Sequence, residues 1–133
     1  GEVSARFRWI GESVALAIHD EQLAQHGGGS GIRDAGLLAS ALAKPQQLAA
    51  YGEPDEFDLA AAYAFGVARN HPFIDGNKRT AWVLARLFLR LHGYSYRGGD
   101  AAAVLTMLNL AAGDIDQDRF AAWLRQHSAA VER

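Results

Sequence analysis

The 133-residue sequence contains no cysteine, only three prolines and no excess of charge of either sign. The absence of cysteine excludes disulfides, thiolate metal sites, iron–sulfur clusters and cysteine nucleophiles. A net charge of −2 argues against a protein that binds nucleic acid through bulk positive charge, so we expect no direct nucleic-acid partner. No apolar run approaches the roughly 18 residues of a membrane helix, and the first residues do not resemble a secretory signal. We therefore expect a cytoplasmic protein with no membrane partner.

The residues that are abundant favour helix. Half of the sequence is hydrophobic and 21% is charged, which is a globular composition rather than that of a disordered chain. The 26 alanines and 15 leucines outnumber the β-branched residues several-fold, and both are strong helix formers. A chain of this length suits one hydrophobic core. The sequence therefore predicts a single all-α domain over residues 1–133.

Apolar residues recur at helical rather than alternating spacing along the whole chain. They predict six helices, over about 11–26, 34–44, 55–70, 77–92, 100–112 and 116–130. Pro45 is expected to end the second helix and leave 46–54 as a loop. Asp34 and Asp116 are expected N-caps, and the acidic segment 55–58 suits the positive end of a helix dipole.

The fourth predicted helix is apolar almost all round. Its polar residues are confined to a narrow strip that contains Arg79, Arg86 and Arg90. Such a pattern predicts the central helix of the domain. The following segment, 94–96, is β-prone and is expected to pair with residues 7–9 in a minor two-stranded ribbon.

One segment departs from this helical pattern, because it concentrates chemistry-bearing side chains in nine residues, 71–79, that lead into the fourth helix. They are His71, Asp75, Asn77, Lys78 and Arg79. A helix N-terminus offers unpaired N–H groups and partial positive charge, and is therefore an anion site. Cations in the first turn oppose the helix dipole, so their presence indicates a bound anion such as a phosphate chain.

Each side chain of the segment has a role in such a site. Asp75 is a hard oxygen ligand suited to Mg²⁺, and His71 can take a proton from an attacking hydroxyl. Asn77 can hydrogen-bond phosphate oxygens, while Phe73 and Ile74 are expected to anchor the loop in the core. Together they predict a phosphoryl- or nucleotidyl-transfer site. The alternative that the residues leave open is a polar turn between helices, with capping residues.

Two histidines of the first predicted helix, His19 and His26, lie seven residues apart on one face. We interpret them as a solvated pair beside the helix end. The alternative is that they form a rim of the active cleft.

The segment HPFIDGNKRT at 71–80 closely resembles the signature of the Fic/Doc superfamily, and its NKR ending is the Doc form. The resemblance extends over roughly residues 7–128. It is carried by HD-x-x-L-x-x-HGG at 19–28, RDAGLL-x-x-AL at 33–42, AYAFGVARNHPF at 62–73, FLRLHGY at 88–94 and the final helical pair. The resemblance implies a compact six-helix fold.

The resemblance also implies a function. Doc proteins are toxins of bacterial type II toxin–antitoxin modules, and phosphorylate a threonine of elongation factor Tu with ATP, which stops translation. Fic proteins share the fold but transfer AMP to a target hydroxyl. The resemblance therefore implies ATP and Mg²⁺ as cofactors, and an antitoxin and elongation factor Tu as partners.

The family's functional residues carry over by position. His71 matches the histidine that activates the target hydroxyl, and Asp75 matches the Mg²⁺-binding acid. The nucleotide-binding positions implied by the motif are Gly76, Asn77, Lys78 and Arg79, together with Arg69 just before it.

One departure from the Fic pattern bears on the chemistry. Lys78 stands where Fic proteins have a second glycine, as in Doc, and this favours phosphoryl transfer. The alternatives are a Fic-type AMP transferase and an inactive antitoxin-binding module. The nearest match to the inhibitory motif of Fic proteins, Ser128–Glu132, is followed by Arg133 and is interpreted as chance. Inhibition is then expected from a separate antitoxin whose amphipathic segment docks in an apolar groove.

Overall fold

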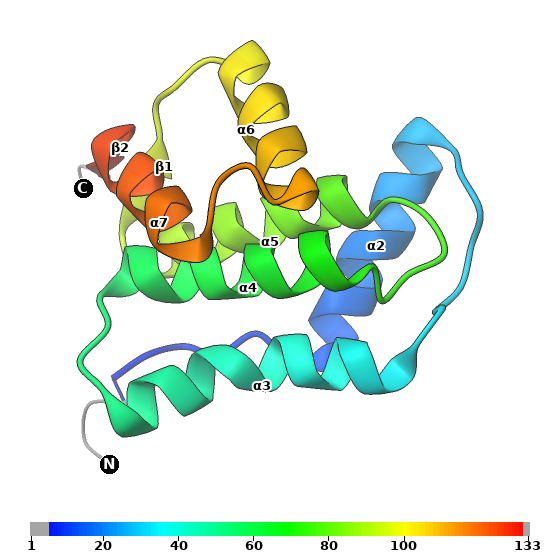
Figure 1. The fold of residues 1–133 in the computed structure, drawn as a ribbon, viewed down its shortest axis with the longest axis horizontal. Helices are drawn as coiled ribbons and strands as arrows, with labels where there is room; N and C mark the ends of the chain where they lie inside the picture. The colour runs from blue at the N-terminus through cyan, green and yellow to red at the C-terminus, as the bar shows by residue number, and fades with distance from the viewer. Residues whose placement is uncertain (1–5, 132–133) are drawn as a thin grey trace.

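The computed structural model describes residues 6–131, which form six helices and one two-stranded ribbon (Figure 1). The helices are α2 (Glu12–His26), α3 (Ala35–Tyr51), α4 (Glu56–Asn70), α5 (Asn77–Leu91), α6 (Asp100–Ala112) and α7 (Gln117–Gln126). The strands are β1 (Tyr94–Tyr96) and β2 (Ser128–Ala130). The predicted all-α class with a minor ribbon is confirmed. None of the described helices has the length and apolar character needed to cross a membrane.

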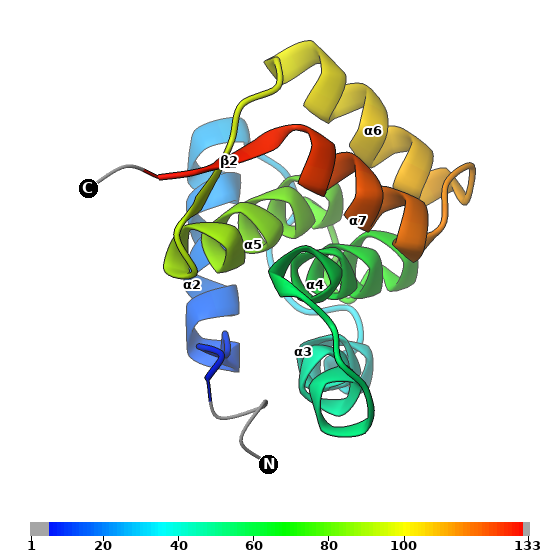
Figure 2. The same cartoon turned by 90° about the vertical axis from the view of Figure 1, so that its left-hand side faces the viewer.

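The central helix is α4, which contacts α3, α5, α6 and α7. Figures 1 and 2 show α4 and α5 in the middle of the molecule, with α6 and α7 on one side and α3 on the other. Residues 59–64 of α4 are at most 1% exposed. The prediction that 77–92 is the central helix is therefore wrong, since Trp82, Val83 and Leu87 of α5 are only half-buried. The alanines of α4 are weakly hydrophobic, but their small size lets several helices approach it closely.

Acidic residues begin three of the helices. The side chains of Asp34 and Asp116 each accept a hydrogen bond from the backbone N–H three residues further on. Asp55 and Asp58 form a reciprocal capping box at the start of α4. The predicted caps are confirmed, and they fix where α3, α4 and α7 begin.

Helix α3 does not end at Pro45 but runs on to Tyr51, so the prediction of a loop over 46–54 is wrong. Proline lacks an N–H group, so one hydrogen bond of the helix is lost at this position. Pro45 is nevertheless buried, as are Leu42 and Ala49 on either side of it. Burial of this apolar stripe against the core offsets the lost hydrogen bond.

Strand β1 pairs antiparallel with β2, and Tyr94 lies opposite Ala130. The predicted pairing with residues 7–9 is wrong, because Phe7 and Trp9 direct their rings against Phe88 instead. Helix α7 ends at Gln126 rather than at 130, since the chain leaves the helix to form β2. The last residues of the inhibitory-motif match, 132–133, lie outside the described residues.

Candidate functional site

Residues 71–76 form a short loop between the end of α4 and the start of α5, two helices that pack side by side. His71 ends α4 in the left-handed conformation, with φ 50° and ψ 59°. Phe73 is fully buried and anchors the loop, as predicted, whereas Ile74 is 59% exposed and does not. The Phe73 side chain thus anchors the loop in the core, while the polar residues His71 and Asp75 are exposed to solvent.

A second loop, which joins α2 to α3, holds the first one. The Arg33 guanidinium donates from Nε to the carbonyl of His71 and from Nη2 to that of Asn70, both at 2.6 Å. It therefore caps the C-terminal end of α4, where a cation also complements the helix dipole. The Ile74 N–H donates to the Gly31 carbonyl at 3.1 Å. The site residues predicted from the sequence do not include Arg33, although it begins the run at 33–42 that carries part of the family resemblance.

Asn77 uses its side chain inside the protein. Its Oδ1 accepts a hydrogen bond from the Phe73 N–H, and its Nδ2 donates to the Phe73 carbonyl, each at 2.9 Å. The residue is 7% exposed. These two bonds close the loop onto the first turn of α5, and the backbone N–H of Asn77 has no side-chain acceptor among residues 6–131.

Asp75 lies exposed on the loop. Its Oδ1 accepts a hydrogen bond from the Gly76 N–H at 2.8 Å, and its Oδ2 accepts one from the Gly29 N–H at 3.3 Å. These two hydrogen bonds lower the pKa of Asp75, and the positive charges of Arg79 and Lys78 act in the same direction. The carboxylate is therefore held ionised and oriented.

The first turn of α5 has no side-chain cap. Gly76 is the N-cap residue, in the left-handed conformation with φ 77° that glycine adopts without steric cost. Among residues 6–131, no side chain accepts a hydrogen bond from the backbone N–H groups of Asn77, Lys78 or Arg79. The side chains of Lys78 and Arg79 are both exposed. The helix terminus thus presents backbone N–H groups without a side-chain acceptor beside two exposed cations, a combination that suits an anion.

These groups surround one cavity of about 240 Å³. It is lined by His71, Ile74, Asp75, Gly76, Asn77, Lys78 and Arg79. The structure thus brings together every site residue named from the motif. Arg69 does not line the cavity, because its guanidinium lies over the Phe65 ring and beside Gly113.

The sequence pattern that describes the Fic/DOC family matches residues 9–89. The chain belongs to the Fic/Doc family. It is 35% identical to the protein kinase doc of Escherichia phage P1 over 126 residues, which cover 94% of this chain and 99% of the phage protein. It is 40% identical to the toxin Doc of Mycolicibacterium smegmatis over 111 residues, which cover 80% of this chain and 85% of that toxin.

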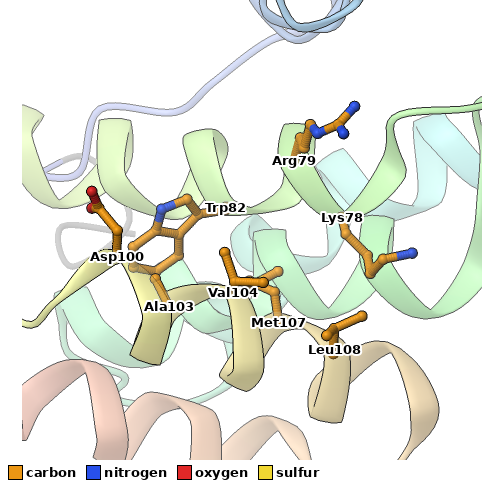
Figure 3. Close-up of a pocket in the computed structure, with 8 residues that line it drawn as sticks. All are labelled: Lys78, Arg79, Trp82, Asp100, Ala103, Val104, Met107 and Leu108. Atoms are coloured by element: carbon orange, nitrogen blue, oxygen red, sulfur yellow. The ribbon is translucent and has the colours of Figure 1, made fainter. Parts of the chain in front are cut away.

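A larger cavity of about 430 Å³ adjoins the motif of this Fic/Doc protein, between α5 and α6. It is lined by Lys78, Arg79, Trp82, Asp100, Ala103, Val104, Met107 and Leu108. Figure 3 shows Lys78 near one end, Trp82 and Asp100 near the other, and apolar side chains of α6 between them. Lys78 and Arg79 line both cavities, so the two are neighbours across the first turn of α5.

His19 on α2 belongs to the site although it is distant in sequence. It is 2% exposed, its Nε2 lies 2.7 Å from the carbonyl oxygen of Asp75, and its ring stacks on Phe73. The interpretation as a solvated pair is wrong for His19, whereas His26 is exposed. Ala15 lies four residues earlier, on the same helix face, and is fully buried. That spacing is the sequence signal that could have marked His19 as buried.

The donor set is compatible with Mg²⁺. Within the part of the chain that the structure describes, no three His, Asp or Glu side chains gather into a metal cage. Mg²⁺ commonly binds through one or two carboxylates and takes its other ligands from phosphates and water. The oriented, ionised Asp75 beside an open anion site fits that pattern.

Proposed function

We propose that this chain is the toxin of a bacterial toxin–antitoxin module, and that it transfers the γ-phosphoryl group of ATP to a hydroxyl of a protein. The observation that carries this proposal is the single cavity that combines His71, Asp75 and the cationic start of α5. The names of the two relatives, a protein kinase and a toxin, support it. Following the family resemblance, the proposed target is elongation factor Tu.

In the proposed reaction, His71 takes the proton of the target hydroxyl. The hydroxyl oxygen attacks the γ-phosphorus, the bond between that phosphorus and its bridging oxygen breaks, and ADP leaves. The His71 imidazole is exposed and makes no hydrogen bond to any side chain or backbone group of residues 6–131. It is thus available to the substrate, while the Arg33 guanidinium fixes its backbone.

The phosphates of ATP are proposed to bind at the start of α5. The free N–H groups of Asn77, Lys78 and Arg79 and the two side-chain cations supply donors and positive charge. Asp75 would hold Mg²⁺, which neutralises phosphate charge when it is bound. Arg69 has no part in this proposal, because its guanidinium packs on Phe65 away from the cavity lining.

Lys78 favours phosphoryl transfer over transfer of AMP. In the first turn of α5 its exposed ammonium group can neutralise charge on the transferred γ-phosphoryl group. A glycine there would leave room for the backbone to wrap the β- and γ-phosphates, and would expose the α-phosphorus. In this proposal the Lys78 side chain fills that room instead.

The proposed antitoxin site is the apolar cavity between α5 and α6. Val104, Leu105 and Leu108 on α6 are each about half exposed or more, and an amphipathic helix could bury them. Lys78 and Arg79 at the cavity wall would attract acidic side chains of such a segment. Growth arrest on expression of this chain, relieved by co-expression of the partner, is the expected behaviour.

The test uses purified elongation factor Tu, ATP labelled at the γ-phosphate, and intact mass spectrometry. The target should gain the mass of one phosphoryl group and the label. His71→Ala should lower the rate by about 10²–10⁴-fold, with His26→Ala as a control that removes an exposed imidazole elsewhere. Lys78→Gly should weaken phosphorylation and permit some AMP transfer.

Two outcomes would contradict the proposal. Addition of an adenylyl group by the unmutated chain would assign the AMP-transferase alternative. Absence of any transfer by the free chain, when that chain is folded and able to bind its antitoxin, would favour an inactive binding module.

A further inference from the structure

The Asp75–Gly76 peptide group precedes a glycine, the residue whose backbone conformation is least restricted. Gly76 adopts φ 77°, and glycine populates positive and negative φ almost equally. Rotation of this peptide plane therefore costs little free energy. A rotation would turn the Gly76 N–H away from the Asp75 carboxylate, to which it now donates at 2.8 Å. It would also move the N-cap of α5. The orientation of this one peptide group therefore determines both the orientation of the Asp75 carboxylate and the position of the first turn of α5.

His19 holds that peptide group. Its Nε2 lies 2.7 Å from the Asp75 carbonyl oxygen. A carbonyl oxygen only accepts hydrogen bonds, so Nε2 carries the proton and donates it. No other hydrogen bond to this carbonyl is present among residues 6–131. The bond joins residues 56 positions apart and ties the motif loop to α2.

The position of the His19 ring is itself fixed. The ring stacks on Phe73, with centroids 3.8 Å apart and planes inclined by 7°. Phe73 is fully buried, and His19 is 2% exposed. Histidine supplies both a flat ring that stacks in this space and an N–H donor directed at the carbonyl.

We propose that His19 is a positioning residue: it fixes the Asp75–Gly76 peptide, and through it the Asp75 carboxylate and the first turn of α5, in the arrangement that binds the nucleotide. The part that concerns the nucleotide rests on the function proposed above. The part that concerns the peptide group does not.

The experiment compares three variants of the whole chain. His19→Phe keeps a stacked ring and removes the donor, whereas His19→Gln keeps an N–H donor in a similar place. His26→Phe changes an exposed histidine on the same helix and is the control. Melting temperature, hydrogen exchange of the Gly76 amide by NMR, and kcat and KM for ATP are measured for each.

We expect His19→Phe to speed exchange of the Gly76 amide and to lower kcat by about tenfold or more, since small misplacements in active sites have such effects. His19→Gln should recover most of both, and His26→Phe should match the unmutated chain. The proposal would be overturned if the His19→Phe and His19→Gln variants lost kcat equally and in proportion to their loss of melting temperature. That result would assign His19 a merely structural role. A His19→Phe variant with unchanged exchange and kcat would also overturn the proposal.

A measurement on the unmutated chain covers the case in which His19→Phe does not fold. The His19 Nε2 proton should be visible in ¹H–¹⁵N spectra as a slowly exchanging resonance coupled to the Asp75 carbonyl. Its absence would overturn the proposal without any variant. If the unmutated chain transfers no group at all, the proposed function fails, whereas the Gly76 exchange data still decide the role of His19.

Discussion

At the scale of single residues, the end of α4 depends on one arginine. Arg33 reaches across from the α2–α3 loop and donates to the carbonyls of Asn70 and His71 at 2.6 Å. His71 is also the one non-glycine residue among 6–131 with a positive φ. A left-handed conformation is unfavourable for a side chain with a Cβ. The guanidinium therefore helps to hold His71 in a conformation that it would not adopt alone.

Arg33→Lys tests this clamp, because it keeps the charge but cannot make two hydrogen bonds in a fork geometry. We expect a loss of about 1 kcal/mol in the free energy of unfolding, typical of a partly exposed hydrogen bond, and a larger relative loss of transfer activity. Urea titration and the labelled-ATP assay measure the two effects. Arg90→Lys, at an exposed position of α5, is the control. A variant equal to the unmutated chain in both assays would show that the clamp has no function.

At the scale of helices, the close approach of α3 to α4 depends on the absence of a side chain at Gly66. A Cβ built at this position would lie 2.8 Å from the Cβ of Ala41 and 3.1 Å from its Cα. Alanine at 66 would improve the intrinsic propensity of α4 by about 1 kcal/mol. It would also force the two backbones apart, in a core where close packing is the main source of stability.

Gly66→Ala is therefore expected to destabilise the protein by about 1–3 kcal/mol, despite the gain in helix propensity. Ala41→Gly in the same chain should recover part of that loss, because it removes the atom that clashes. A double-mutant cycle by urea unfolding measures the coupling between the two positions. Strictly additive effects would mean that the helices do not meet at these residues.

The start of α4 is joined to α7 by a charged cluster. The Arg125 guanidinium contacts Asp55 at 2.8 Å and Asp58 at 3.3 Å. Burial acts to raise the pKa of Asp55, but the hydrogen bonds from the Asp58 N–H and from Arg125, with the charge of Arg125, outweigh it and lower the pKa. Asp55 thus stays ionised in the folded protein at pH values where the unfolded chain binds a proton.

The sign of the pH effect follows from this lowered pKa. The stabilisation by Asp55 is complete above its unfolded value of 3.8 and is lost as the pH falls through the lower folded value. Arg125→Ala should lose less stability between pH 5 and pH 2 than the unmutated chain, since its Asp55 gains less in the folded state. Arg119→Ala, which removes an equal charge from α7 outside this cluster, is the control. Parallel pH profiles from denaturant titrations would contradict the expectation.

The elements that the sequence predicts correctly are those with local causes. The caps at Asp34 and Asp116 depend on a backbone group three residues away, so their pattern is visible in a short window. The partner of β1 depends instead on where α7 ends, more than thirty residues later. The prediction that α3 ends at Pro45 considers only the local effect of proline, its missing N–H group. Burial of Pro45 against the core allows the helix to continue. Tertiary packing overrides local preference at each point where the prediction is wrong.

At the scale of the whole molecule, the same distinction separates the parts of the site. Most of the site is one contiguous segment, from His71 to Arg79, which the sequence predicts as a unit. The residues that support it come from other elements: His19 from α2 and Arg33 from the following loop. Folding brings them together, and their spacing in the sequence contains no sign of the contact. The sequence therefore predicts the reactive groups and omits the groups that hold them.

Ligand binding should stabilise the whole chain. Mg²⁺ with ATP at 100 times the dissociation constant should add about 2.7 kcal/mol to the free energy of unfolding, measured as a rise in melting temperature. Asp75→Asn should remove most of the dependence on Mg²⁺ and leave a smaller response to ATP alone, because the start of α5 is unchanged. A chain whose melting temperature responds to no nucleoside triphosphate would contradict the proposed nucleotide site.

The first turn of α5 is a wall common to both cavities, since Lys78 and Arg79 line each of them. Carboxylates that pair with these cations from the α6 side lower the positive potential available to phosphates on the motif side. Under the function proposed above, the nucleotide and the antitoxin would then be negatively coupled through shared charge, without any change of shape. Such coupling is reciprocal. Bound nucleotide would lower the affinity for the antitoxin by the same factor by which bound antitoxin lowers the affinity for nucleotide. The cellular nucleotide concentration would thereby set how much antitoxin is needed for neutralisation.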